Sequence, residues 1–226
     1  AAIDGGGTGE LEAIAAKVTA SGCVRDAAID ALGVHGGRAF LVGHPLGDSL
    51  HDHFAVTVYE GESDLLGLAL FKGLAKHHPA AGRSATEPSA LARAADWLAW
   101  RASIWARGDR DDRMLDRGLR GHAVAARRLL AAKALEIDRA IRRHGRGLAE
   151  RQLEVGTLAG DVRELVGVLA VAHHGDASGI PAVDMAADCW CRMALARARG
   201  RRPAGGDLAA VARLGREVAG RPFPAV

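Results

Sequence analysis

The stretch ELEAIAAKVTASGCVRDAAIDAL, residues 10–32, indicates the fold class of this chain. Its apolar residues recur at three- and four-residue spacing, which places them on one face of an α-helix. Six of them are expected to face inward: Leu11, Ile14, Ala15, Val18, Ala28 and Ile29. Gly33 follows and is predicted to end the helix as a left-handed C-cap. Ala, Leu, Arg and Glu dominate the rest of the chain, so we expect an all-α helical bundle.

A linker at residues 81–88 is predicted to separate two helical domains, residues 1–80 and residues 89–226. Pro88 and the small polar residues before it favour turns over helix. Further helices are predicted over residues 62–76, 89–107, 113–144, 148–173, 181–199 and 207–219. The helix at 62–76 is expected to bury Leu65, Leu66, Ala69, Leu70 and Leu74. The helix at 89–107 is expected to be anchored by Trp97, Trp100 and Trp105.

Residues 40–58 carry Gly43, Pro45 and Gly47 and are therefore predicted to form a long ordered loop. Residues 54–58 alternate in the manner of a strand, but the sequence offers this segment no convincing partner strand.

Composition excludes several classes of protein. The 226 residues carry a formal charge of only +3, and Arg is interleaved with Asp and Glu, which argues against a dedicated nucleic-acid surface. The three cysteines are odd in number, so a disulfide framework is not expected and a reducing compartment fits. No apolar run approaches the roughly 20 residues that a membrane span needs. We expect a cytoplasmic protein.

No metal site is predicted from the sequence. His51 and His53, the pair His173-His174, and Cys189 with Cys191 all carry metal-capable side chains. None of these pairs is completed by further ligands at a recognised spacing. Surface histidines and packed cysteines are therefore the interpretation of these residues.

Four short motifs follow one another between residues 32 and 62. They are Leu32-Gly33-Val34-His35-Gly36-Gly37, then Pro45-Leu46, then His51-Asp52, then Tyr59-Glu60-Gly61-Glu62. Together they resemble the end of the C-terminal helical domain of the acyl-CoA dehydrogenase family. Residues 89–226 resemble, in position and helical character, the extra helical domain of members that act on very long acyl chains.

The resemblance implies a flavin-dependent enzyme whose catalytic base is Glu60. In the family this glutamate removes the α-proton of an acyl-CoA thioester, and its backbone N–H binds the thioester carbonyl. By the same motif, Gly36, Gly37 and Glu62 would contact FAD, and Tyr59 and Gly61 would contact the substrate. The Gly-Gly contact usually crosses a subunit interface, so a homo-oligomer is implied. The simpler interpretations are that Glu60 only favours a helix start and that Gly36-Gly37 only ends a helix.

Three positions depart from the family pattern. Gly33 stands where the family commonly has Gln, Glu62 where it has Thr or Ser, and His51-Asp52 where it has Arg-Asp. The family's N-terminal helices and middle β-domain have no counterpart here, so the resemblance implies the C-terminal part of a longer protein. The alternatives are a noncatalytic helical scaffold of the same fold and an acyl-CoA oxidase. The second domain is expected to be structural, serving subunit contacts or, less favoured, a membrane surface.

Overall fold

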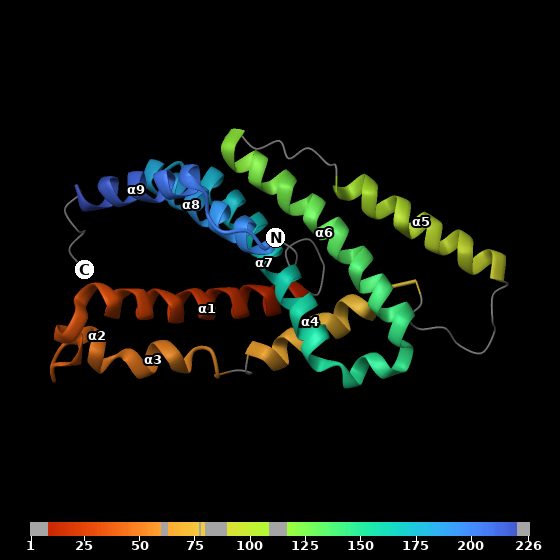
Figure 1. Ribbon diagram of the computed structural model, residues 1–226, viewed down its shortest axis with the longest axis horizontal. Helices are drawn as coiled ribbons and strands as arrows, with labels where there is room; N and C mark the ends of the chain where they lie inside the picture. The colour runs from red at the N-terminus through yellow and green to blue at the C-terminus, as the bar shows by residue number, and fades with distance from the viewer. Residues whose placement is uncertain (1–8, 60–62, 77, 80–89, 109–116, 221–226) are drawn as a thin grey trace. The chain divides into compact units, whose positions relative to one another are not determined.

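The computed structural model describes residues 9–59, 63–76, 78–79, 90–108 and 117–220 (Figure 1). Within these ranges every regular element is a helix: nine α-helices and two short 3-10 helices, with no strand. The all-α prediction is confirmed. The chain packs into two compact units, Ala1–Ala81 with Gly147–Gly160, and Gly82–Arg146 with Asp161–Val226. The whole predicted linker, residues 81–88, lies outside the described ranges.

The first unit is built on α1 (Glu10–His35), against which α3 (Leu50–Ala55) and α4 (Ser63–Lys76) pack. Small and apolar side chains fill these contacts. The buried residues of α1 are Ala15, Val18, Ser21 and Ala28, and those of α4 include Leu70 and Phe71. Gly73 lets α4 approach α1 closely, because a Cβ at this position would collide with the side chain of Leu11.

Several predictions for this unit are wrong in detail. Helix α1 continues through Gly33 to His35, since a glycine inside a helix costs only about 1 kcal/mol. Residues 40–58 are not a loop, because they form the end of η1 (Gly36–Phe40), α2 (Pro45–Asp48) and α3. The strand-like run at 54–58 is the end of α3 followed by turns. Leu65, Ala69 and Ile29 were expected inside and are exposed.

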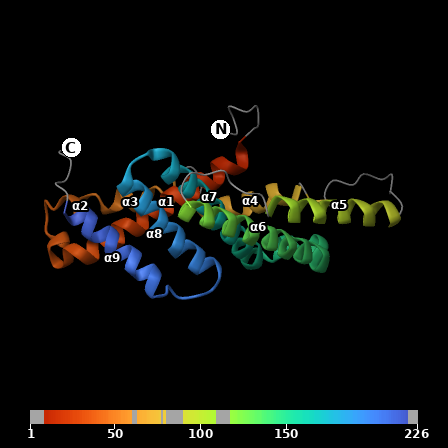
Figure 2. The ribbon, with the colours of Figure 1, turned by 90° about the horizontal axis from the view of Figure 1, so that it is seen from above.

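The second unit contains α5 (Ala90–Gly108), α6 (Arg117–His144), α8 (Pro181–Ala198), α9 (Gly205–Ala219) and the larger part of α7 (Gln152–Ser178). Helix α6 lies between α5 and the α8–α9 pair, as Figures 1 and 2 show. The core is completely buried at four large side chains: Leu119, Leu165, Val168 and Cys191. The short η2 (Gly145–Glu150) precedes α7.

The predicted helices of this unit exist, but both ends of α7 and one anchor differ from the prediction. Helix α7 begins at Gln152 rather than near residue 148, and it runs through Gly175 to Ser178. Trp97 and Trp100 are half-buried, whereas Trp105 is 64% exposed. Trp97 and Trp100 are three residues apart and share a face, but Trp105 is five residues further and turns to the opposite side.

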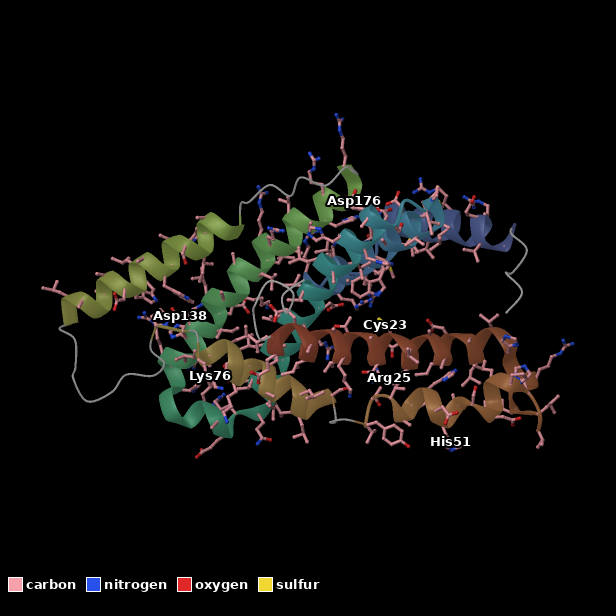
Figure 3. The ribbon with its side chains drawn as sticks, turned by 180° about the vertical axis from the view of Figure 1, so that it is seen from behind. Cys23, Arg25, His51, Lys76, Asp138 and Asp176 are labelled. Carbon is pink, nitrogen blue, oxygen red and sulfur yellow. The ribbon has the colours of Figure 1, made fainter. Side chains whose placement is uncertain are left out.

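A buried carboxylate fastens α5 to α6. Asp138 is 4% exposed and lies where α6 meets α5 (Figure 3). The indole N–H of Trp97 donates to both oxygens of Asp138 at 3.2 Å, and Nε of Arg142 donates to Oδ1 at 2.9 Å. The Arg142 guanidinium also stacks over the Trp97 ring, 4.4 Å from its centroid. Trp97 thus anchors the helix as predicted, through a polar contact as well as packing.

Within the described ranges, no helix is both long enough and apolar enough to cross a lipid bilayer.

Candidate functional site

The first part of the predicted site is the turn that ends α1. Gly36 has a φ of +59°, a backbone conformation that residues with a Cβ rarely adopt, and its N–H donates to the carbonyl of Leu32. A Cβ placed on Gly36 or on Gly37 would meet no heavy atom within 4 Å. The turn therefore presents bare backbone beside open space, which another molecule can approach closely.

Exposed apolar side chains surround this turn. Val34 is 87% exposed, Phe40 is 75% exposed and Val42 is completely exposed, whereas Ala39 between them is fully buried and fixes the turn. Gly47 completes the packing, because a Cβ at Gly47 would collide with the carbonyl oxygen of Ala39. Large apolar side chains exposed close together in the sequence make this turn a candidate contact surface.

Two histidines also meet at the turn. The rings of His35 and His44 pack edge to face, with centroids 5.1 Å apart and planes at 72°. Nδ1 of His44 is buried and has no hydrogen-bond partner in the described part of the chain. Arg38, in the same turn, is exposed. Sequence reasoning missed the pair, since no motif links positions nine residues apart across a turn.

The second part of the predicted site is the junction between α3 and α4. The N–H of Tyr59 donates to the carbonyl of Ala55 at 2.9 Å, and the Tyr59 side chain is 69% exposed. The Ser63 hydroxyl at the start of α4 donates to the carbonyl of Thr57 at 3.2 Å, which ties the two sides of the junction together. Glu60, Gly61 and Glu62 lie outside the described residues.

The described residues of the two parts lie apart from one another. Gly36 and Gly37 follow α1 and precede α2, whereas Tyr59 follows α3, so the parts lie at opposite ends of the α2–α3 segment (Figure 1).

No family model, no curated protein and no solved structure matches this chain. The functional assignment therefore depends on the order of the motifs and on the local geometry described above.

A polar network that the sequence did not indicate links α6 to α8. Nε2 of His122 lies 2.8 Å from Oδ1 of Asp188, and Nε of Arg192 donates to Oδ2 at 2.8 Å. The side chains of His122 and Asp188 are each only 14% exposed. Burial alone would raise the pKa of Asp188, but the hydrogen bonds and charges of Arg192 and His122 outweigh burial and lower it. Each carboxylate oxygen of Asp188 already has a partner, so the network fits a structural clasp.

This clasp predicts a pH-dependent contribution to stability. Because the pKa of Asp188 is lower in the folded protein, its contribution is complete above the unfolded value of about 4 and is lost as pH falls through the folded value. Asp188→Asn is expected to lower the free energy of unfolding by about 1–2 kcal/mol at neutral pH. Urea unfolding at several pH values should show the difference from wild type shrinking in acid. The exposed Asp30→Asn is the control and should change stability by less than about 0.5 kcal/mol. A difference that does not vary with pH would contradict the clasp.

The cysteines and histidines considered as metal ligands do not form a metal site among the described residues. Burial raises the pKa of Cys191 to about 12, and its thiol donates to the carbonyl of Val168 at 3.6 Å. Cys189 is buried as well, and burial again raises the pKa of the thiol. His51 is exposed on α3 (Figure 3). Among the side chains that the structure describes, no three metal-capable groups come together.

Proposed function

We propose that this chain is the C-terminal part of a flavin-dependent acyl-CoA dehydrogenase and that Glu60 is its catalytic base. The observation that carries the proposal is the Gly36-Gly37 turn, with positive φ at Gly36 and open space beside both glycines. It ends a long helix and is followed by two short helices, a turn at Tyr59 and helix α4. The Pro45-Leu46, His51-Asp52 and Tyr59 motifs occur along this segment in the family's order. The second unit would then be the appended helical domain, with a structural role.

The chemistry asks for a carboxylate at the position of Glu60. The α-proton of a thioester is weakly acidic, so its base needs a raised pKa, and a bound acyl chain supplies the desolvation that raises the pKa of a carboxyl group. The backbone N–H of Glu60 would hold the thioester carbonyl and stabilise the negative charge that develops on its oxygen. Bound FAD would take the β-hydrogen as hydride, leaving the 2-enoyl-CoA.

The residues of the turn fit the phosphate-bearing part of FAD. Bare backbone at Gly36 and Gly37 permits close approach, and the exposed side chains of His35 and Arg38, in the same turn, could donate to a phosphate. Gly33, one helical turn before Gly36, offers no side-chain contact in place of the family's Gln.

The separation of the two parts supports a homo-oligomer. The resemblance implies that this turn contacts FAD bound by a neighbouring subunit. The turn can therefore lie far from the catalytic base of its own subunit. The exposed Phe40 and Val42 would then be covered at the subunit interface.

Two alternatives have the same fold. Gly33 and Glu62 favour a noncatalytic scaffold, because both replace residues that face the cofactor in the family. An acyl-CoA oxidase would use the same glutamate and flavin and differ in access of oxygen.

The test is made on the parent protein that carries this chain together with flavin-binding domains. Acyl-CoA added without oxygen should bleach the absorbance of bound FAD, and turnover should require an electron acceptor other than oxygen. Rapid turnover with oxygen alone would instead identify an oxidase. A folded parent that holds no FAD and leaves acyl-CoA unchanged would identify the scaffold.

A glycine substitution probes the proposed cofactor contact. Gly37→Val fits the structure, because the space beside Gly37 is open, but its side chain would occupy the path of the cofactor. We expect FAD to bind at least about 10-fold more weakly, measured by flavin fluorescence during dilution. Gly22→Val, also beside open space but in the middle of α1, is the matched control and should bind FAD normally. Equal FAD affinity of the Gly37 variant and wild type would rule out the contact.

A further inference from the structure

Helix α5 carries an exposed apolar stripe on the side that does not face α6. Leu91, Leu98 and Trp105 are spaced seven residues apart and are 84%, 58% and 64% exposed. Ala95 and Ala102 are exposed between them, each four residues after a leucine. This alternating spacing of four and three residues is the seam of a coiled coil. We call these five residues the α5 seam.

The opposite face of α5 is already in use. Trp97, Trp100 and Ile104 are half-buried, and α5 packs along α6. Helix α5 is therefore apolar on two faces, of which one is covered. An exposed apolar stripe on a helix is typical of an interaction surface. The seam is therefore a candidate contact surface.

Charge narrows the choice of partner. Arg101 is the one charged residue that borders the seam among the described side chains, and its guanidinium lies over the Trp97 ring, 5.1 Å from the centroid. The seam offers little positive charge to an acidic partner helix. It also lacks the several basic residues that bind a protein surface to an anionic membrane. An uncharged apolar stripe matches the seam best.

We infer that a second copy of this chain covers the seam, with the two α5 helices antiparallel about a twofold axis at Leu98. This arrangement places Leu91 against Trp105 of the second copy. By symmetry, each end of the interface then pairs one tryptophan with one leucine. The exposed Ala94 then lies opposite Ala102 of the second copy, so the two backbones approach closely. A parallel pair would instead stack two tryptophans at one level. Opposed helix dipoles also favour the antiparallel pair.

The available area predicts a weak dimer. The three large side chains and the alanines between them offer a total buried surface on the order of 1,000 Å² for two copies, near the lower limit for specific interfaces. The dissociation constant is then expected to be on the order of 10 µM.

The first experiment measures the mass of the whole chain by sedimentation between about 1 and about 100 µM. The interface proposed at the Gly36-Gly37 turn depends on FAD bound by the parent protein, so it is not expected to form in this chain alone. We therefore expect wild type to pass from monomer to dimer in this range and Leu98→Glu to remain a monomer with unchanged helical circular dichroism. Leu208→Glu, on α9, is the matched control because Leu208 is 56% exposed, and it should dimerise like wild type. A wild-type chain that stays monomeric throughout, or a dimer that survives Leu98→Glu, overturns the inference.

The second experiment tests the antiparallel register by disulfide formation in a Cys23→Ser background, which removes the exposed native thiol. Leu98→Cys should form a disulfide dimer on mild oxidation. Leu91→Cys should not, because the two Leu91 positions would lie about 21 Å apart along the paired helices. Mixing Leu91→Cys with Trp105→Cys should restore the crosslink. A Leu91 to Leu91 disulfide would show a parallel pair and overturn the proposed geometry.

Discussion

If the parent protein is the proposed dehydrogenase, glutamine in place of Glu60 is expected to reduce its kcat by about 10²- to 10⁴-fold. The amide keeps the shape of the side chain but cannot take a proton, so the loss should fall on the chemical step. Affinity for FAD should stay at the wild-type level, because the backbone and the Gly36-Gly37 turn are unchanged. Single-turnover reduction of the flavin by acyl-CoA, followed by absorbance, measures this step directly.

Glu62→Thr is the natural companion to this variant, because it restores the residue type usual in the family two positions further on. It should keep most of the activity, which would separate a role of Glu60 as the base from a general sensitivity of the junction to lost charge. If Glu60→Gln retains more than about a tenth of wild-type kcat, a barrier change below roughly 1.4 kcal/mol, then another group is the base.

The helical periodicity of this sequence was enough to predict the helices near their observed positions. Apolar spacing reports which face of a helix is buried, and Pro181 and Gly200 stand at the boundaries of α8. The same logic failed between residues 40 and 58. Pro45 and Gly47 indicated a loop, yet Pro45 is favourable in the first turn of a helix and Gly47 is needed for close packing on Ala39.

The candidate site could be predicted only in part. Adjacent glycines such as Gly36 and Gly37 predict a turn, because the backbone freedom of glycine is a local property. Contacts between distant positions leave no such mark. The rings of His35 and His44, and the pairing of His122 with Asp188, depend on how helices pack, which single-sequence patterns do not encode. The role of Glu60 stays a prediction, because the structure does not describe that residue.

The sequence predicted a helix that ends at residue 173, but Gly175 lies inside α7 at a point of close helix packing. A Cβ at this position would lie 2.6 Å from Cβ of Ala187 on α8 and 3.1 Å from Cδ1 of Leu119 on α6. Leu119 is completely buried and Ala187 is 4% exposed, so neither has open space to move into. The sequence could not distinguish a glycine that breaks a helix from one that lets a neighbour approach.

Gly175→Leu is therefore expected to destabilise the second unit by about 3 kcal/mol through overpacking. Leucine is the better helix former by nearly 1 kcal/mol, so any stabilisation of α7 itself opposes this loss and does not cancel it. Gly121→Leu is the matched control: Gly121 is exposed on α6 beside open space, and the same change there should be neutral or slightly stabilising. Urea unfolding followed by circular dichroism compares the two variants with wild type. If Gly175→Leu is as stable as Gly121→Leu, then α7 does not pack against α6 and α8 at this point.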